Sequence, residues 1–365
     1  MSHFRFAALI VSVFVSAGAT IIFLGLTSEP YVGDLTRLGG YQESAFGWRE
    51  PQQRFVPPRY FAERFEPSSD MLVLGDSMTL RRDAEQTDPG AFWTNWLAVK
   101  TGWTISALHR RDFTVEDVMA LPAYRQSPPR LFVLEFAERA ISGLERVTQV
   151  ALQAQGGCEG QRPGSLPVLA VQPPSPQPMP EPLALAQPAR KPLDLSLGGH
   201  RLKHWLTRQV WPGRLGAVAF PMTRADLFSN RQSDTLLVYR DDLIKVGLSD
   251  VQLRQQACGL RALQRSVEAD GRTRFVVLIV PDKLSAYRPY VEGFPARYPA
   301  VVPILAEQPL LGLPRVDLAF DEALRAGARD LFMPNDTHLG ALGHRLLAEA
   351  LLSDLEARGF ARVQP

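Results

Sequence analysis

The chain has 365 residues, of which 45% are hydrophobic. That is enough to bury one large core or two smaller ones, and it excludes a disordered or fibrous protein. The 40 basic and 38 acidic residues leave a formal charge of +2, so no strong electrostatic field indicates a nucleic-acid partner. The two cysteines, Cys158 and Cys258, exclude a disulfide-rich scaffold and a zinc module held by four cysteines.

An uncharged apolar run extends from Phe6 to Thr27 and is about as long as the roughly 20 residues that a membrane helix needs. We therefore expect an uncleaved, single-pass membrane anchor over residues 1–28. A cleavable signal peptide, whose apolar part is about 7–15 residues long, is the alternative. Arg5 precedes the run and Glu29 follows it, so the positive-inside bias places the N-terminus in the cytoplasm and the remaining chain outside the membrane.

The two cysteines have two interpretations. An oxidising compartment outside the membrane would permit a disulfide between Cys158 and Cys258. Alternatively, Cys258 is a small buried apolar residue, because it is in line with Leu253, Leu260 and Val267 on one face of an expected helix.

Short apolar runs alternate with amphipathic segments from residue 69 onward, which predicts an α/β fold with a central parallel sheet and helices on both of its faces. The expected strands are 71–75, 103–107, 131–136 and 275–280, and the expected helices are 91–100, 115–121, 251–269, 320–328 and 341–357. The proline-containing residues 29–68 are predicted to form a stalk or a wrapping segment. Residues 153–195, rich in Pro, Gln, Ala and Gly, are predicted to be an exposed insertion loop within one domain that spans 69–361.

The residues that indicate chemistry follow the first strand and precede the last helix. Ser77 stands in a turn at the carboxyl end of the strand 71–75, the edge of a parallel sheet where ligands bind. A serine hydroxyl needs a base to become a nucleophile, and the short spacing of Asp336 and His338 lets the carboxylate orient the imidazole toward it. Asp76 is expected to support the turn, and His344 to be a surface or packing residue.

Together, the Gly-Asp-Ser at the strand end and the Asp336-Thr337-His338 element before the last helix are the two ends of the SGNH (GDSL) hydrolase pattern, which this chain resembles from about residue 70 to 360. The segments 237–245 and 280–287 resemble the AlgX/AlgJ-like branch of that superfamily, the periplasmic alginate O-acetyltransferases and their relatives. The resemblance implies a three-layer α/β/α domain in the periplasm, held to the inner membrane by the anchor. It also implies that acyl groups, usually acetyl, are transferred or removed on an exported polysaccharide.

The chain departs from that branch in three places. Its serine precedes the Asp-x-His element, Leu339 replaces a tryptophan, and the segment 106–114 lacks the glycine that supplies an oxyanion donor. Arg139 occupies roughly the place of the family's oxyanion asparagine, so we expect it to stabilise the oxyanion. The alternative is that it is a structural partner of a neighbouring glutamate.

The segment 280–287 contributes two further predicted site residues. Lys283 and Tyr287 follow a buried strand, so we expect them at the same sheet edge as Ser77, in contact with substrate. The alternative for Lys283 is a surface salt bridge with Asp282 or another neighbour.

These residues predict a membrane-anchored serine acyltransferase or esterase, and the resemblance implies that it works in the periplasm and adds or removes O-acetyl groups on an exported polysaccharide. No metal or cofactor is required for a Ser-His-Asp mechanism. A transferase would need an acyl donor at the membrane, and the resemblance implies a membrane-bound O-acyltransferase as partner. The alternative is a non-catalytic polysaccharide-binding or assembly protein that retains the SGNH fold.

Overall fold

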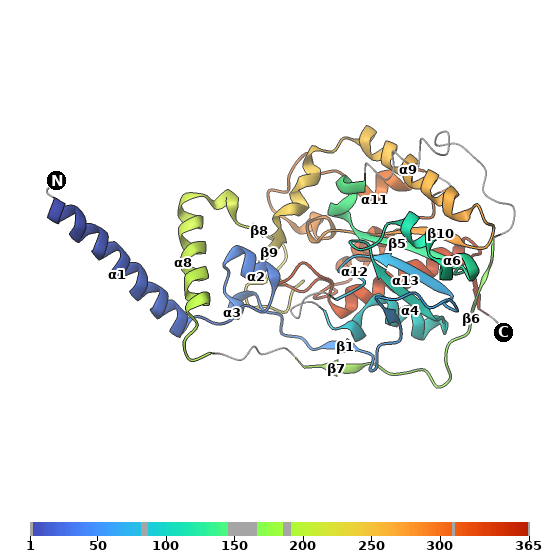
Figure 1. Ribbon diagram of the computed structural model, residues 1–365, viewed down its shortest axis with the longest axis horizontal. Helices are drawn as coiled ribbons and strands as arrows, with labels where there is room; N and C mark the ends of the chain where they lie inside the picture. Colours follow the sequence, from blue (N-terminus) through green and yellow to red (C-terminus); the bar gives the residue numbers. More distant parts are fainter. Residues whose placement is uncertain (1–2, 82–86, 145–165, 185–190, 309–310, 364–365) are drawn as a thin grey trace.

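The computed structural model describes residues 3–81, 87–144, 166–184, 191–308 and 311–363. At its centre is a five-stranded parallel sheet in which the strands have the order β10-β5-β3-β4-β2 (Figure 1). The strands are β2 (Phe61–Ala62), β3 (Met71–Gly75), β4 (Ile105–His109), β5 (Leu131–Ala137) and β10 (Arg274–Val280). Every residue of the last four is buried, which explains why they are continuous apolar runs instead of alternating ones.

Helices pack on both faces of this sheet, and side chains of successive strand residues enter two separate apolar clusters. Met71 and Val73 belong to one cluster, whereas Leu72 and Leu74 belong to the other, as the two-residue period of a strand requires. The first cluster includes side chains of α4 (Trp93–Thr101), α12 (Val316–Arg325) and α13 (Ala341–Ala357). The second includes side chains of α5 (Val115–Ala120), α6 (Pro122–Gln126), α9 (Asp250–Glu268) and α11 (Val301–Ala306). The predicted α/β class with a central parallel sheet is therefore confirmed.

Residues 29–68 wrap around the domain. They contain α2 (Asp34–Gly39), α3 (Glu43–Phe46), β1 (Gln52–Arg54) and β2. Leu35 and Phe46 pack against the antiparallel hairpin of β8 (Ala217–Pro221) and β9 (Thr235–Tyr239), and β2 joins the central sheet as its edge strand. Residues 29–68 are thus a segment that wraps around the domain, and they do not form a separate stalk.

The described part of the proline-rich segment differs from the predicted loop. β6 (Leu169–Val171) pairs in parallel with β11 (Ala361–Val363), and β7 (Glu181–Leu183) pairs antiparallel with β1. Proline is tolerated in such short two-stranded pairs because each strand has a partner on one side only. Cys258 on α9 is disulfide-bonded, while Cys158 lies outside the described residues.

Two helices lie at one end of the molecule (Figure 1). α1 (His3–Thr27) projects from the domain and is long and apolar enough to cross a membrane. α8 (Leu195–Val210), which the sequence analysis did not anticipate, packs at the C-terminal end of α1. The remaining short helices are η1 (Pro89–Ala91), η2 (Glu138–Leu144), η3 (Pro212–Arg214), η4 (Arg240–Gly247), α10 (Lys283–Ala286) and η5 (Arg288–Tyr290).

Candidate active site

The strand order places a topological switch point at the carboxyl ends of β3 and β5. From β3 the chain continues to β4 on one side and then returns past β3 to β5 on the other side. Adjacent strands whose connections leave in opposite directions form the switch point where open α/β sheets bind ligands. Ser77 follows β3 and Arg139 follows β5, so the topology places both residues at this point.

The turn that presents Ser77 is held by the side chain of Asp76. Its Oδ1 accepts a hydrogen bond from the Met78 N–H at 2.9 Å, and its Oδ2 accepts one from the Ala137 N–H at 2.9 Å. Asp76 thus ties the turn after β3 to the end of β5, as the sequence predicted. Gly75 is required before it, because a Cβ atom there would lie 2.7 Å from the buried Glu135 carboxylate.

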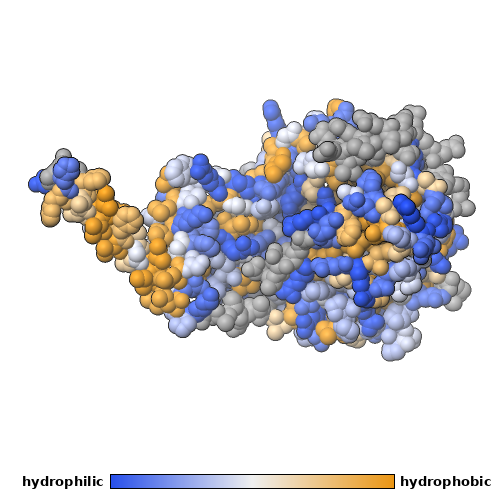
Figure 2. All heavy atoms as spheres, viewed as in Figure 1, coloured by the Kyte–Doolittle hydropathy of each residue, from blue (hydrophilic) through white to orange (hydrophobic). Residues whose placement is uncertain are grey.

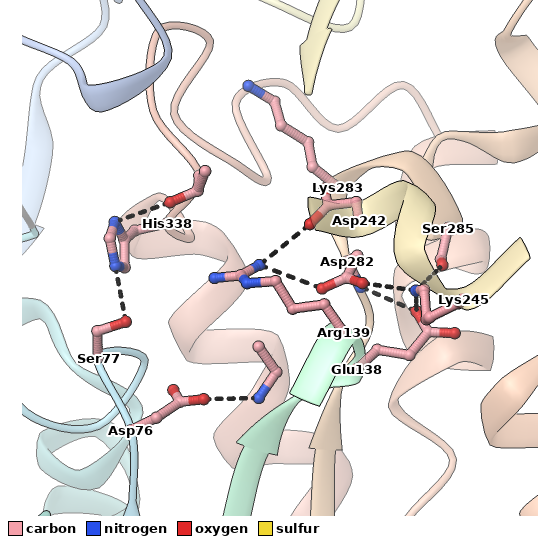
Figure 3. A network of polar contacts seen from close by, with 12 residues as sticks. Asp76, Ser77, Glu138, Arg139, Asp242, Lys245, Asp282, Lys283, Ser285 and His338 are labelled. Carbon is pink, nitrogen blue, oxygen red and sulfur yellow. Dashed lines mark hydrogen bonds and ion pairs between the residues drawn. The ribbon is translucent and has the colours of Figure 1, made fainter. Parts of the chain in front are cut away.

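Ser77, His338 and Asp336 form a hydrogen-bonded triad (Figure 3). The His338 Nε2 atom lies 3.0 Å from the Ser77 Oγ atom, and the Nδ1 atom lies 2.5 Å from Asp336 Oδ1. The same Asp336 oxygen accepts the backbone N–H of His338 at 3.0 Å, which fixes the ring relative to its own loop. This is the arrangement in which an imidazole oriented by a carboxylate can remove the serine proton.

The wrapping segment contributes a fourth residue, Asp34, to this cluster. The Asp34 N–H donates to Asp336 Oδ2 at 3.0 Å. The Asp34 carboxylate in turn accepts the Thr337 N–H at 2.8 Å and the Thr337 hydroxyl at 2.6 Å. The N–H groups of Leu35 and Thr36 donate to the Asn335 carbonyl. The first turn of α2 therefore clamps the loop that carries His338 and Asp336, the other two members of the triad.

The charges of the cluster shift its pKa values in opposite directions. Burial and the negative charge of Asp336 raise the pKa of Asp34 to about 6. Burial opposes ionisation of Asp336, but the charge and hydrogen bond of His338 outweigh it and hold the pKa of Asp336 below its ordinary value. For His338 burial acts downward, and the neighbouring carboxylate of Asp336 more than compensates, so its pKa is raised. The cluster therefore favours a protonated imidazole, the form produced when the serine proton is removed.

The same three residues have the donor types of a cation site. One ligand atom from each of Asp34, Asp336 and His338 can be chosen so that all lie within 4.8 Å of one another. Both ring nitrogens of His338, however, are hydrogen-bonded to Asp336 and Ser77. The geometry therefore fits proton transfer from Ser77 better than metal coordination.

Arg139 is held beside the triad by buried acids. Its Nη1 atom lies 3.3 Å from Asp242 Oδ1 and 3.2 Å from Asp282 Oδ1. Figure 3 shows the other end of the guanidinium pointing toward Ser77 and His338, with the two aspartates on the opposite side. Burial opposes the charge of Arg139, but these carboxylates raise its pKa and keep it positive.

A second buried cation, Lys245, completes the network behind Arg139. Its Nζ atom lies 3.0 Å from Glu138 Oε2, 2.5 Å from Asp282 Oδ2 and 3.2 Å from Ser285 Oγ. Burial and the adjacent Asp282 raise the pKa of Asp242 to about 8. Asp282 is shared between the two cations, with Oδ1 facing Arg139 and Oδ2 facing Lys245. The segments 237–245 and 280–287, singled out in the sequence, thus meet at Arg139.

Lys283 has a different position from the predicted one. Its Nζ atom donates to three backbone carbonyls of the Asp-His loop, those of Met333 at 2.7 Å, Pro334 at 2.9 Å and Asp336 at 3.1 Å. The side chain is 1% exposed and burial lowers its pKa to about 7. The prediction that Lys283 contacts substrate is contradicted by this burial, and so is the alternative of a surface salt bridge. Instead, the Lys283 side chain fixes the Asp-His loop through these three hydrogen bonds.

Tyr287 and His344 are both core residues. Tyr287 is fully buried and lies against Phe228 and Phe332, with ring centroids 4.7 and 6.2 Å away. The prediction that Tyr287 contacts substrate is therefore wrong. His344 is fully buried and packs edge-on against Phe92, which is the packing role expected for it. Burial lowers the pKa of His344 to about 3, so it stays neutral.

Comparison with protein-family models, curated proteins and solved structures finds no match for this chain. Its chemistry is therefore argued from the site itself. Sequence reasoning missed Asp34, because its segment has no periodic pattern and the contact with Asp336 spans 302 residues of chain. It also missed the roles of Asp242 and Lys245, although both lie in a segment that the sequence analysis had singled out.

Proposed function

We propose that the protein is a serine acyltransferase or esterase of the SGNH type. The observation that carries the proposal is the triad, in which one ring nitrogen of His338 faces Ser77 Oγ at 3.0 Å and the other faces Asp336 at 2.5 Å. Ser77 follows β3 in a turn, and Asp336 and His338 lie in the loop before α13, as the resemblance to SGNH hydrolases implies. The proposal includes the three-layer α/β/α arrangement of that superfamily.

The proposed chemistry is a two-step transfer of an acyl group. His338 takes the proton of Ser77 Oγ, which attacks the carbonyl carbon of an acyl ester. The bond to the leaving alcohol then breaks, and His338 returns the proton to that alcohol. In the second step a sugar hydroxyl or water loses its proton to His338 and attacks the carbonyl carbon of the acyl-serine. The bond to Ser77 Oγ breaks, and His338 returns the proton to that oxygen, which restores the serine.

Arg139 is the proposed oxyanion stabiliser. Its guanidinium is fixed by Asp242 and Asp282 on one side and is directed toward Ser77 on the other (Figure 3). A cation held in place before the reaction stabilises the charge that develops on the carbonyl oxygen without reorganisation. Arg139, held by Asp242 and Asp282, is thus proposed to replace two donors that the family would supply: the glycine missing from the segment 106–114 and the asparagine whose place Arg139 occupies.

The proposed setting is the periplasmic side of the inner membrane, with α1 as the anchor and an exported polysaccharide as the acyl acceptor. Three observations support it: α1 is apolar enough to span a bilayer, Arg5 precedes the uncharged run Phe6–Thr27 within it, and acidic residues follow it. An acyl donor delivered by a membrane-bound O-acyltransferase would reach the site from the same membrane. The triad mechanism itself needs no cofactor or metal.

The test of the nucleophile is labelling of the purified full chain with a fluorophosphonate. We expect covalent modification of the wild type at Ser77 and none in Ser77→Ala, while Ser142→Ala serves as a matched control and labels like the wild type. Equal labelling of wild type and Ser77→Ala would refute the proposal, and complete absence of labelling in a folded protein would favour the non-catalytic binding alternative. Mass spectrometry of acetylated and unacetylated oligosaccharides then separates acetyl transfer from hydrolysis.

A further inference from the structure

The start of α8 packs against the C-terminal end of α1. The Asp194 N–H, just before α8, donates to the Gly25 carbonyl at 3.1 Å. Gly198 approaches α1 so closely that a Cβ atom there would lie 2.1 Å from the Ile21 carbonyl oxygen. A helix of 25 residues is about 37 Å long, and the hydrocarbon core of a bilayer is about 30 Å thick. The contacts with Ile21 and Gly25 therefore place the start of α8 where hydrocarbon gives way to headgroups.

One face of α8 is bound to the domain by basic side chains. Arg201 donates to the carbonyls of Tyr41 at 2.9 Å and Glu29 at 3.0 Å. Arg208 donates to the Gly39 carbonyl at 2.7 Å. Both guanidinium groups also lie over tyrosine rings of the wrapping segment. This face is fixed, so the opposite face of α8 points away from the domain.

That opposite face is apolar and open. A groove of about 430 Å³ runs along it, lined by Gly199, Leu202, Lys203, Leu206, Thr207, Val210 and Trp211. Trp205 is 58% exposed, but it stands four residues after Arg201 and three before Arg208, on the side of α8 that carries the arginines. Leu206, Val210 and Trp211 belong to the groove lining and are between 47% and 58% exposed. Such a concentration on a single helix marks an interaction surface.

We infer that this apolar face of α8 lies in the headgroup region of the bilayer that α1 crosses. Figure 2 shows the apolar surface of α1 standing clear of the domain, and α8 packs against α1 where that surface reaches the domain. Tryptophan rings at the polar ends of membrane segments are typical of this region, and Trp211 in the groove lining provides one here. Trp205, on the side of α8 that carries the arginines, is equally exposed. The exposed Lys203 beside the groove suits a headgroup phosphate.

The inference rests on the proposed membrane anchor but not on the proposed acyl transfer. Its consequence is a second attachment point, which limits rotation of the domain about α1. A single helix would leave the domain free to turn, whereas a helix lying in the interface fixes one side of it toward the lipid.

Tryptophan quenching by lipid tests this contact directly, because α1 contains no tryptophan. The full chain is reconstituted into phosphatidylcholine–phosphatidylglycerol vesicles with or without brominated acyl chains. We expect brominated lipid to quench part of the wild-type fluorescence, and the double variant Trp205→Phe/Trp211→Phe to lose that quenchable part. Trp48→Phe is the matched control and keeps it. A second variant, Leu206→Lys, leaves both rings in place and is expected to weaken the quenching.

Three results would overturn the inference. Quenching that survives unchanged in the double variant would place the quenched ring elsewhere. If the vesicle-bound wild type is not quenched at all, α8 does not touch lipid, although the anchor stands; its groove would then be open to a protein partner. A chain that fails to remain with the vesicles contradicts both the anchor and the contact. Fluorophosphonate labelling of the same samples reports separately on the active site.

Discussion

Replacing Asp34 by asparagine should move the pH dependence of the serine toward lower pH. The Asp34 carboxylate stabilises the protonated form of His338 by its negative charge, and this is one of the causes that raise the pKa of His338. Only neutral His338 can act as the base. In Asp34→Asn the charge is gone, the pKa of His338 falls, and the rise in reactivity with pH occurs earlier.

The size of the shift follows from the geometry. Ligand atoms of Asp34 and His338 lie within 4.8 Å of each other. At that distance two unit charges interact by about 0.9 kcal/mol at the dielectric constant of water and by about 3.5 kcal/mol at an effective value of about 20. Since one pKa unit corresponds to about 1.36 kcal/mol, the midpoint should fall by about 0.6 to about 2.5 units.

The assay is the second-order rate constant of fluorophosphonate labelling between about pH 5 and pH 9, which needs no knowledge of the natural substrate. The maximal rate can also fall, because asparagine offers one acceptor oxygen to the two Thr337 donors, so the midpoint is the diagnostic quantity. Asp234→Asn, at an exposed position in the β8–β9 hairpin, is the matched control. An unchanged or higher midpoint in a folded Asp34→Asn protein would refute the reasoning.

Further changes test the supports of the site. Arg139→Met, combined with Asp242→Asn so that no extra acid is left unpaired, should slow labelling by about 10²–10³-fold; a rate near that of Asp242→Asn alone would show that Arg139 is structural. Lys283→Met leaves three loop carbonyls without their donor and should lower the free energy of unfolding by about 3 kcal/mol, measured by urea denaturation; an unchanged midpoint would contradict this support. Gly33→Ala brings a Cβ atom to 2.0 Å from the Asn335 carbonyl oxygen and should reduce labelling, whereas Gly213→Ala meets nothing within 4 Å and should not; equal rates would show that the clamp is dispensable.

The local pattern of apolar residues was sufficient to predict the fully buried strands of the central sheet and the last helix. The run Met71–Gly75 is buried on both faces and therefore carries its apolar signal in every residue. The last helix begins and ends at the predicted residues, Ala341 and Ala357, because the loop with Asp336 and His338 precedes it and a polar turn follows it. The triad could be predicted from the sequence because a parallel sheet places the loops at the carboxyl ends of its strands at one edge. These loops carry Ser77, Asp336 and His338.

The misassigned residues depend on side-chain direction, which spacing alone does not determine. Lys283 follows β10 at the correct sheet edge, yet its side chain is buried against the Asp-His loop and donates to that loop's backbone carbonyls. Tyr287 is one turn further on and faces the aromatic core. Asp34 and Asp336 are far apart in sequence, and only the folded wrapping segment brings them into contact.

The closeness of α1 to the triad has a consequence for what the proposed enzyme can reach. α1 ends at Thr27 and α2 begins at Asp34, whose N–H contacts Asp336. About seven extended residues cover at most about 25 Å, so Asp34 lies no further than that from the end of α1. If α1 spans the bilayer as proposed, Ser77 works within a shallow zone above the lipid. Acyl groups emerging from the membrane enter that zone at once, whereas a polymer is accessible only over the stretch that passes through it.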